Sequence, residues 1–143
     1  PKGGDEINLL NINELSSKKS PNYGWPIASY GEHYVYDKKK YEKYPLYKSH
    51  SKYGFIEPLK SFVPSIGISE IVQLGSRQYV VSSLKDHSLY FFNLNDKNAL
   101  QNIQRVEVFE RVRDLKFKDQ SLFMFLEDSA SIGVIKIHKS INL

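Results

Sequence analysis

The sequence lacks cysteine altogether, and it has no long hydrophobic run. Without thiols it can form no disulfide, no thiol nucleophile, and no zinc or iron–sulfur site held by cysteine. The longest uninterrupted apolar stretches, such as residues 122–126, are about five residues long, whereas a membrane-spanning helix needs about 18. The chain begins Pro-Lys-Gly-Gly, with neither an initiator methionine nor a visible signal peptide. We therefore expect a piece of a longer protein.

Two common kinds of motif are also missing. None of the eight glycines lies in a Gly-x-Gly pattern and no Gly-Lys-Ser or Gly-Lys-Thr occurs, so the chain has no recognisable phosphate-binding loop. The four histidines are scattered, without a paired spacing such as His-Glu-x-x-His that predicts zinc. These absences argue against a nucleotide-dependent or zinc-dependent enzyme.

The overall composition is that of a folded domain with a modest positive charge. Of the 143 residues, 41% are hydrophobic and 25% are charged, and 20 Lys+Arg against 16 Asp+Glu give a net charge of +4. This balance is typical of a soluble globular chain and excludes a wholly disordered one. The length predicts one domain over residues 1–143.

Three zones are visible along the chain. Residues 1–29 hold one apolar run at 7–12 and predict an entering strand followed by a turn, and residues 30–60 form a Tyr- and Lys-rich excursion. Residues 61–143 predict short strands at 66–74, 79–82, 87–94, 112–117, 122–126 and 133–137. The strand starts recur at intervals of about ten residues, which favours an antiparallel sandwich, barrel or propeller over βαβ units.

Two local features of the last zone are specific enough to be checked. Residues 99–112 are ambiguous, because their apolar positions fit either a helical stripe or the alternation of a strand; we favour a strand that begins near Ile103. The polar trio 118–120 lies between two apolar segments and predicts a hairpin tip at Asp119 and Gln120.

The N-terminal segment Gly3-Gly4-Asp5-Glu6 has two interpretations. It matches the active-site turn of diguanylate cyclases, but that signature needs a strand–helix–helix–strand unit upstream, and only two residues precede it. The simpler interpretation is a glycine turn that enters a strand, with two exposed carboxylates able to hold a hard cation such as calcium.

The Tyr- and Lys-rich zone also has two interpretations. Seven of the ten tyrosines lie between Tyr30 and Tyr53, with six lysines among them. Rings interleaved with cations can stack on a single nucleic-acid strand and neutralise it. Three acidic residues reduce the local charge to 6 − 3 = +3, and arginine is absent. We therefore favour a surface excursion anchored by aromatic rings, and we predict no nucleic-acid partner.

Three cations form the most informative polar set. Arg111 and Arg113 are separated by one residue on a predicted strand, so both side chains leave the same face. Adjacent guanidiniums repel each other unless an anion lies between them, and arginine is suited to binding carboxylates with two hydrogen bonds. Lys85 follows another predicted strand closely. The alternative, which the spacing alone favours, is that all three are ordinary solvated charges.

Five short segments occur in an order known from one protein family. They are PKGGDEINL at 1–9, NYGWP at 22–26, VPSI at 63–66, SLK at 83–85 and RVRD at 111–114. Together they resemble the C-terminal part of the glucose/sorbosone dehydrogenase family, which includes soluble quinoprotein aldose dehydrogenases. The resemblance implies an all-β fold, a partial six-bladed β-propeller with about the last two blades and the entering strand, in which residues 61–143 supply the blade strands.

The resemblance also implies cofactor-binding residues. Lys85 matches a lysine that contacts pyrroloquinoline quinone (PQQ), and Arg111 and Arg113 match an arginine pair that holds the charged groups of this cofactor. Ser65 falls where the cofactor pocket has a hydroxyl residue.

Calcium is implied at two places by the same resemblance. The backbone carbonyl of Pro1 matches a ligand of the calcium ion beside the cofactor. Glu6 and the carbonyl of Tyr23 match ligands of a second, structural calcium ion.

No catalytic residue is expected in this chain. In the family, a histidine base takes the substrate hydroxyl proton while hydride moves to the quinone, and this base lies on earlier blades, upstream of Pro1. We expect the C-terminal part of a PQQ-dependent sugar (aldose) dehydrogenase-like protein, periplasmic or secreted, which acts on a sugar or another small polyol only when complete. The alternatives are a non-catalytic propeller that serves as a protein-interaction module, or a basic single-stranded nucleic-acid binder.

The last predicted strand bears on self-association. In the family, a strand from the N-terminal end of the whole protein commonly completes the final blade. Without it, strand 133–137 presents unpaired backbone groups, and a bare apolar edge favours pairing with another chain. We expect the isolated chain to form a homodimer through this edge.

Overall fold

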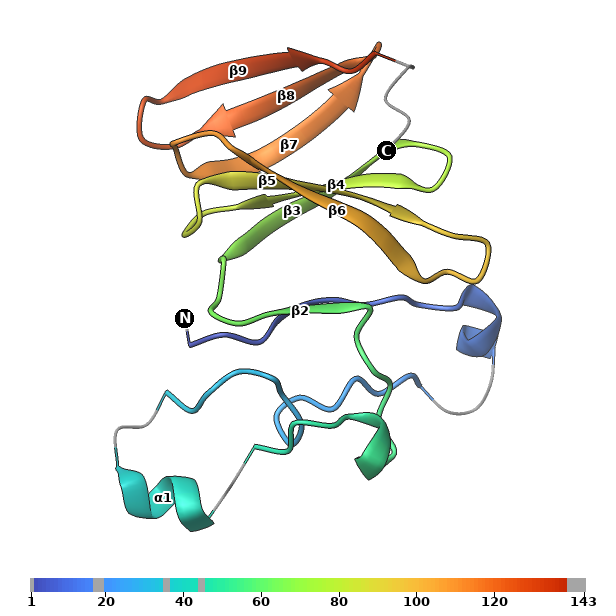
Figure 1. Cartoon of the computed structure of the whole chain (residues 1–143), viewed down its shortest axis with the longest axis vertical. Helices are drawn as coiled ribbons and strands as arrows, with labels where there is room; N and C mark the ends of the chain where they lie inside the picture. Colours follow the sequence, from blue (N-terminus) through green and yellow to red (C-terminus); the bar gives the residue numbers. More distant parts are fainter. Residues whose placement is uncertain (1, 17–19, 35–36, 44–45, 139–143) are drawn as a thin grey trace. The chain divides into compact units, whose positions relative to one another are not determined.

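The structure, a computed structural model, consists mainly of short antiparallel strands (Figure 1). It describes residues 2–16, 20–34, 37–43 and 46–138. The chain divides into two compact units, Pro1–Ser65 and Ile66–Leu143. Residues 61–65, which the sequence groups with the blade strands, therefore belong to the first unit, and a single domain over the whole chain stays a prediction.

The first unit holds one small sheet and several short helical turns. Strand β1 (Asp5–Ile7) pairs antiparallel with β2 (Lys60–Phe62). The helical turns are η1 (Ile12–Ser16), α1 (Lys38–Lys43) and η2 (Ser51–Tyr53).

The entering strand is shorter than the apolar run that predicts it. The backbone N–H of Leu59 donates to the Ile7 carbonyl at 2.8 Å. The next residue along the partner segment is Pro58, which has no N–H to continue the ladder. Beyond Ile7 the run turns outward, and Leu10 and Ile12 are exposed.

A glycine turn leads into β1, as the simpler interpretation of this segment predicts. Gly3 and Gly4 have φ of 90° and 83°, a backbone region that favours glycine. The backbone of Gly31 approaches so closely that a Cβ there would lie 2.3 Å from the Gly3 carbonyl oxygen. The carboxylates that follow are partly buried rather than exposed, because Asp5 and Glu6 have partners within the unit.

The second unit holds two sheets. The four-stranded sheet contains, in chain order, β3 (Ile68–Gly75), β4 (Gln78–Ser83), β5 (Ser88–Leu94) and β6 (Leu100–Glu107). The three-stranded sheet contains β7 (Val112–Lys118), β8 (Ser121–Leu126) and β9 (Ser131–Lys136). Each of the six predicted strands is present, with ends within two residues of those predicted.

The ambiguous segment is a strand, and it starts earlier than predicted. Strand β6 begins at Leu100, opposite Leu94 of β5, rather than near Ile103. The turn before it is organised by the Asn95 side chain, whose Oδ1 accepts the N–H groups of Lys97 and Ala99 at 2.9 Å each. Pairing with β5 therefore selects the strand from two patterns that the sequence leaves balanced.

The hairpin tip predicted between β7 and β8 is confirmed. Asp119 and Gln120 connect the two strands, with φ of 49° and 59°. Positive φ at both central residues is the geometry of the two-residue turn whose twist matches that of the flanking strands.

The core of the second unit lies between the two sheets. A buried cluster draws on both, and consists of Val80, Leu89, Val112, Leu115, Leu122 and Met124. The Ser69 hydroxyl of β3 donates to the Val112 carbonyl of β7 at 2.6 Å, and Figure 1 shows the two sheets side by side. The described part of the chain is all-β apart from short helical turns, as predicted. Among the described residues, no helix is both long and apolar enough to cross a membrane.

Candidate functional site

Arg111 and Arg113 converge on one carboxylate. Arg111 Nε lies 3.3 Å from Glu127 Oε1, and an Arg113 guanidinium nitrogen donates to Glu127 Oε2. Arg111 lies just before β7 and Arg113 lies on it, and an anion lies between the two side chains. That anion is a residue of the chain itself.

The turn after β8 places Glu127. Its backbone N–H donates to the Arg111 carbonyl at 2.9 Å, and the Arg111 N–H donates to Asp128 Oδ2 at 3.0 Å. Sequence reasoning missed Glu127. The signal that identifies it is the strand register, because Val112 pairs with Leu126 and so puts residue 127 opposite residue 111.

Lys85 lies in the turn from β4 to β5, and its side chain is exposed. Its backbone N–H donates to the Ile66 carbonyl at 2.9 Å, just before β3 begins. Near the same end of β3, Ser69 bonds to Val112, the residue between the two arginines. Since a strand rises about 3.3 Å per residue, the backbones that carry Lys85 and the arginine pair lie at the same end of neighbouring strands.

A three-membered polar cluster braces the Lys85 turn. Asp86 Oδ2 accepts the Tyr90 hydroxyl at 2.6 Å and Arg105 Nε at 2.8 Å. Burial opposes ionisation of Asp86, but these hydrogen bonds outweigh it and lower the pKa of its carboxyl. Burial, with the Asp86 carboxylate, raises the pKa of Tyr90 to about 12. The brace therefore holds one ionised carboxylate next to Lys85.

One cavity of the second unit, of about 300 Å³, adjoins the arginine pair. Its lining joins charged and apolar side chains: Arg113, Phe125, Leu126, Glu127, Ala130, Ser131 and Ile132. Lys85 does not line it. The cavity therefore places apolar surface beside Arg113 and Glu127, and participation of Lys85 in a shared site stays a prediction.

Ser65 belongs to the first unit and is buried. Its hydroxyl donates to the Asp5 carboxylate, with Oγ 2.8 Å from Oδ2 and 3.0 Å from Oδ1. This contact closes the end of the β1–β2 sheet. The predicted role of Ser65 in cofactor binding is a separate matter and stays a prediction.

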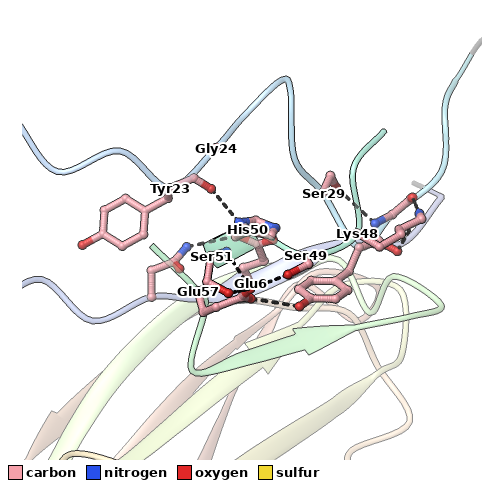
Figure 2. Close-up of polar contacts among 12 residues, drawn as sticks. Glu6, Tyr23, Gly24, Ser29, Lys48, Ser49, His50, Ser51 and Glu57 are labelled. Carbon is pink, nitrogen blue, oxygen red and sulfur yellow. Dashed lines mark hydrogen bonds and ion pairs between the residues drawn. The ribbon is translucent and has the colours of Figure 1, made fainter. Parts of the chain in front are cut away.

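The two groups predicted to bind a second calcium ion lie on either side of one histidine (Figure 2). His50 Nδ1 is 2.8 Å from the Tyr23 carbonyl oxygen. Because a carbonyl can only accept, Nδ1 carries the proton. His50 Nε2 is buried, makes no hydrogen bond with the described residues, and lies 3.4 Å from Glu6 Oε1.

A second carboxylate, Glu57, organises the segment around His50. It accepts the Ser51 N–H at 2.8 Å, the Ser51 hydroxyl at 3.0 Å and the Tyr30 hydroxyl at 2.9 Å (Figure 2). The bond from the Ser51 N–H, joined by those from the two hydroxyls, lowers the pKa of Glu57 to about 2 despite partial desolvation. Its partnership with Glu57 raises the pKa of Tyr30.

The two predicted calcium sites differ in how much of each the structure describes. Pro1 lies outside the described residues. Within the described part of the chain, no three His, Cys, Asp or Glu side chains come together to hold a metal ion. As they lie, Glu6 and Tyr23 do not fit a shared calcium ion, because the His50 ring contacts both. The proposed function therefore does not include a second calcium ion, and no step of the proposed chemistry depends on it.

Where it is described, the Tyr- and Lys-rich zone contains α1 and η2 and is otherwise mostly irregular. The Lys48 ammonium donates to the carbonyls of Tyr30 and Gly31, and the rings of Tyr47 and Tyr53 stack with centroids 3.9 Å apart. These are anchoring contacts within the unit. Tyr36 and Tyr44 lie outside the described residues.

A family model of glucose/sorbosone dehydrogenases matches residues 1–136. The chain belongs to this family. The resemblance carried by the five short segments is thereby confirmed for nearly the whole chain.

Relatives with curated descriptions are distant and much longer. The aldose sugar dehydrogenase YliI of Escherichia coli is 26% identical over 145 aligned residues, which cover 96% of this chain and 36% of that protein. An uncharacterised protein of Synechocystis is 26% identical over 122 residues, covering 80% of this chain and 26% of that protein. The chain thus spans roughly a quarter to a third of the relatives that it matches.

Solved structures agree on the fold and confirm the predicted fold class, part of a six-bladed β-propeller. The soluble aldose sugar dehydrogenase of Escherichia coli, in its apo form, superposes with a TM-score of 0.70 at 22% identity, covering 95% of this chain and 39% of that one. A glucose dehydrogenase gives a TM-score of 0.69 at 22% identity, covering 99% of this chain and 39% of that one.

Proposed function

We propose that this chain is the C-terminal part of a PQQ-dependent sugar (aldose) dehydrogenase and contributes cations that bind the cofactor. The observation that carries the proposal is the arginine pair at the start of β7, in a chain of the glucose/sorbosone dehydrogenase family. The Lys85 turn at the same end of neighbouring strands supports it.

The donors suit a polycarboxylate such as PQQ. The side chains of Arg111 and Arg113 are 39% and 56% exposed, so both remain open to a ligand although Glu127 contacts them. A guanidinium has five N–H donors, and a carboxylate engages two of them. The exposed parts of both arginines therefore have donors left for the cofactor.

In this proposal the named residues of the chain bind the cofactor or its calcium ion and do not carry out the chemistry. When bound, PQQ supplies the two-electron acceptor that takes hydride from the sugar. Lys85, Arg111 and Arg113 of the second unit hold its charged groups. For the first unit we keep two separate predictions, that the Ser65 hydroxyl contributes to cofactor binding and that the Pro1 carbonyl binds a calcium ion. The proton acceptor for the sugar hydroxyl comes from another part of the protein, so the chain by itself does not turn over.

The proposal also covers the substrate, the location of the protein and its self-association. The substrate is a sugar or another small polyol, and the protein works in the periplasm or outside the cell. In the described part of the chain β9 pairs with β8 alone, and Ile132 and Val134 on it are exposed. We propose that the isolated chain pairs through this edge as a homodimer, because unpaired strand edges associate. Sedimentation as a monomer at micromolar concentration would contradict the dimer.

Binding of PQQ to the purified chain tests the function. Titration followed by quinone absorbance should give saturable binding, and Lys85→Ala and Arg111→Ala should each weaken it about tenfold, the loss of one charge-assisted hydrogen bond. Lys97→Ala is the matched control, since Lys97 is exposed in the turn between β5 and β6. Equal affinity in all four proteins would refute the assignment. Absence of binding, with no PQQ-dependent sugar oxidation by the longer protein, would favour the non-catalytic interaction module.

A further inference from the structure

The buried His50 is the group that the proposed function leaves unused. Its ring is fully buried in the first unit. Each ring nitrogen faces one oxygen, the Tyr23 carbonyl on one side and the Glu6 carboxylate on the other (Figure 2). These two oxygens are the ones at which the family resemblance implies a structural calcium ion.

A calcium ion and the His50 ring compete for the same place. Calcium takes about six to eight oxygen ligands, each at about 2.3–2.6 Å. An ion that bound both the Glu6 carboxylate and the Tyr23 carbonyl would have to lie between them, where the imidazole makes its contacts. Imidazole nitrogen suits softer metals than calcium, so His50 cannot simply join the ligand set.

The ring is held in this place by its other neighbours. Tyr30 stacks on it with a centroid separation of 5.2 Å and an interplanar angle of 12°. The Tyr30 hydroxyl is fixed in turn by Glu57, which also binds the Ser51 N–H next to His50. Moving the ring aside to admit an ion would break the Nδ1 bond and the stack together.

We propose that the His50 side chain stands in for a structural calcium ion in the first unit. The ring hydrogen-bonds through Nδ1 to the Tyr23 carbonyl, 27 residues away in the sequence, and its Nε2 lies 3.4 Å from Glu6 Oε1 of β1, a charge contact rather than a hydrogen bond. This is the cross-link that an ion bound to the same two oxygens would supply. The first unit then folds without calcium at this position and does not bind it there. The inference is independent of PQQ and of the calcium ion assigned to Pro1.

The unmodified chain gives the first test. Its melting temperature should be the same in millimolar calcium and in EDTA. Hydrogen exchange of a peptide spanning residues 46–59 should also be unchanged, and this peptide reports on the His50 segment alone. A calcium-dependent rise in melting temperature that Glu6→Gln abolishes would overturn the proposal.

Variants at His50 give the second test. His50→Ala should lower the melting temperature and speed exchange of the 46–59 peptide, in calcium and in EDTA alike. His50→Asp exchanges the ring for a shorter carboxylate beside the Glu6 and Tyr23 oxygens, and should gain a calcium-dependent rise of several degrees. His138→Ala and His138→Asp are the matched controls, because His138 is exposed, and neither should respond. Unchanged exchange in His50→Ala would overturn the proposal even if the aspartate variant does not fold.

Discussion

Glu127→Gln probes the arginine pair most directly. The substitution keeps the shape of the side chain and removes the charge that Arg111 and Arg113 share. Two guanidiniums then lie side by side without an anion of the chain between them. We expect the second unit to lose stability and, at the same time, to gain affinity for added polycarboxylates.

The expected loss of stability depends on how exposed the two ion pairs of Glu127 are to solvent. Glu127 is 37% exposed and the two arginines more so, so solvent screens both pairs. Exposed ion pairs contribute about 0.2–1 kcal/mol each, and the repulsion left between the guanidiniums adds a similar amount. The expected total is about 1–2 kcal/mol. For a unit of about 60–100 residues, each kcal/mol lowers the melting temperature by about 4–8 °C.

Urea and thermal unfolding, followed by circular dichroism, measure this loss. Citrate, a tricarboxylate, should recover more stability in Glu127→Gln than in the unmodified chain, because it replaces the missing anion. Asp96→Asn is the matched control, because Asp96 is fully exposed and its contact with Arg77 Nε is long, at 3.9 Å. The free energy of unfolding of this variant should stay within about 0.5 kcal/mol of that of the unmodified chain. Unchanged stability of Glu127→Gln, together with an unchanged response to citrate, would refute the reasoning.

Three further predictions concern stability. Leu122→Ala removes a fully buried side chain of the core cluster and should cost about 2–5 kcal/mol in urea unfolding; a loss below about 1 kcal/mol would contradict the packing of the two sheets. The pKa of Glu57 is lowered to about 2 from 4.5, which gives a stabilisation that is full above pH 4.5 and lost as pH falls towards 2. The stability of Glu57→Gln should lack this pH-dependent loss in acid unfolding. An identical pH profile in the variant and the unmodified chain would exclude the contribution of Glu57. The pKa of Tyr90 is raised to about 12 from 10.0, which gives a stabilisation present below pH 10 and lost as pH rises through 12. In an absorbance titration at alkaline pH, Tyr90→Phe should lack the tyrosine that ionises last. If that last ionisation step persists in the variant, it belongs to another residue.

The strands of the second unit follow from the sequence because their signals are local. Apolar alternation and turn residues act over a few positions, and they give the ends of six strands within two residues. The same locality explains the hairpin at Asp119 and Gln120. Where two periodicities overlap, as at residues 99–112, only pairing with β5 decides between them.

The resemblance is carried by short segments. It predicts the family and a cofactor role for Lys85, Arg111 and Arg113, but it does not indicate which residues contact these cations in the folded chain. It gave no reason to look at Glu127, which reaches Arg111 only through the register of β7 and β8. Residues 7–12 likewise do not reveal where the entering strand ends, because Pro58, which cannot continue the ladder, lies in the partner segment.

By itself, the sequence determined which residue types are present and where short strands form. The tertiary structure alone decided what lies between Glu6 and the Tyr23 carbonyl. His50 comes from a segment with little periodicity, far from both along the chain. Its position depends on the stacked Tyr30 ring and on Glu57 together. Contacts between distant segments form only when the chain folds, so no local pattern announces them.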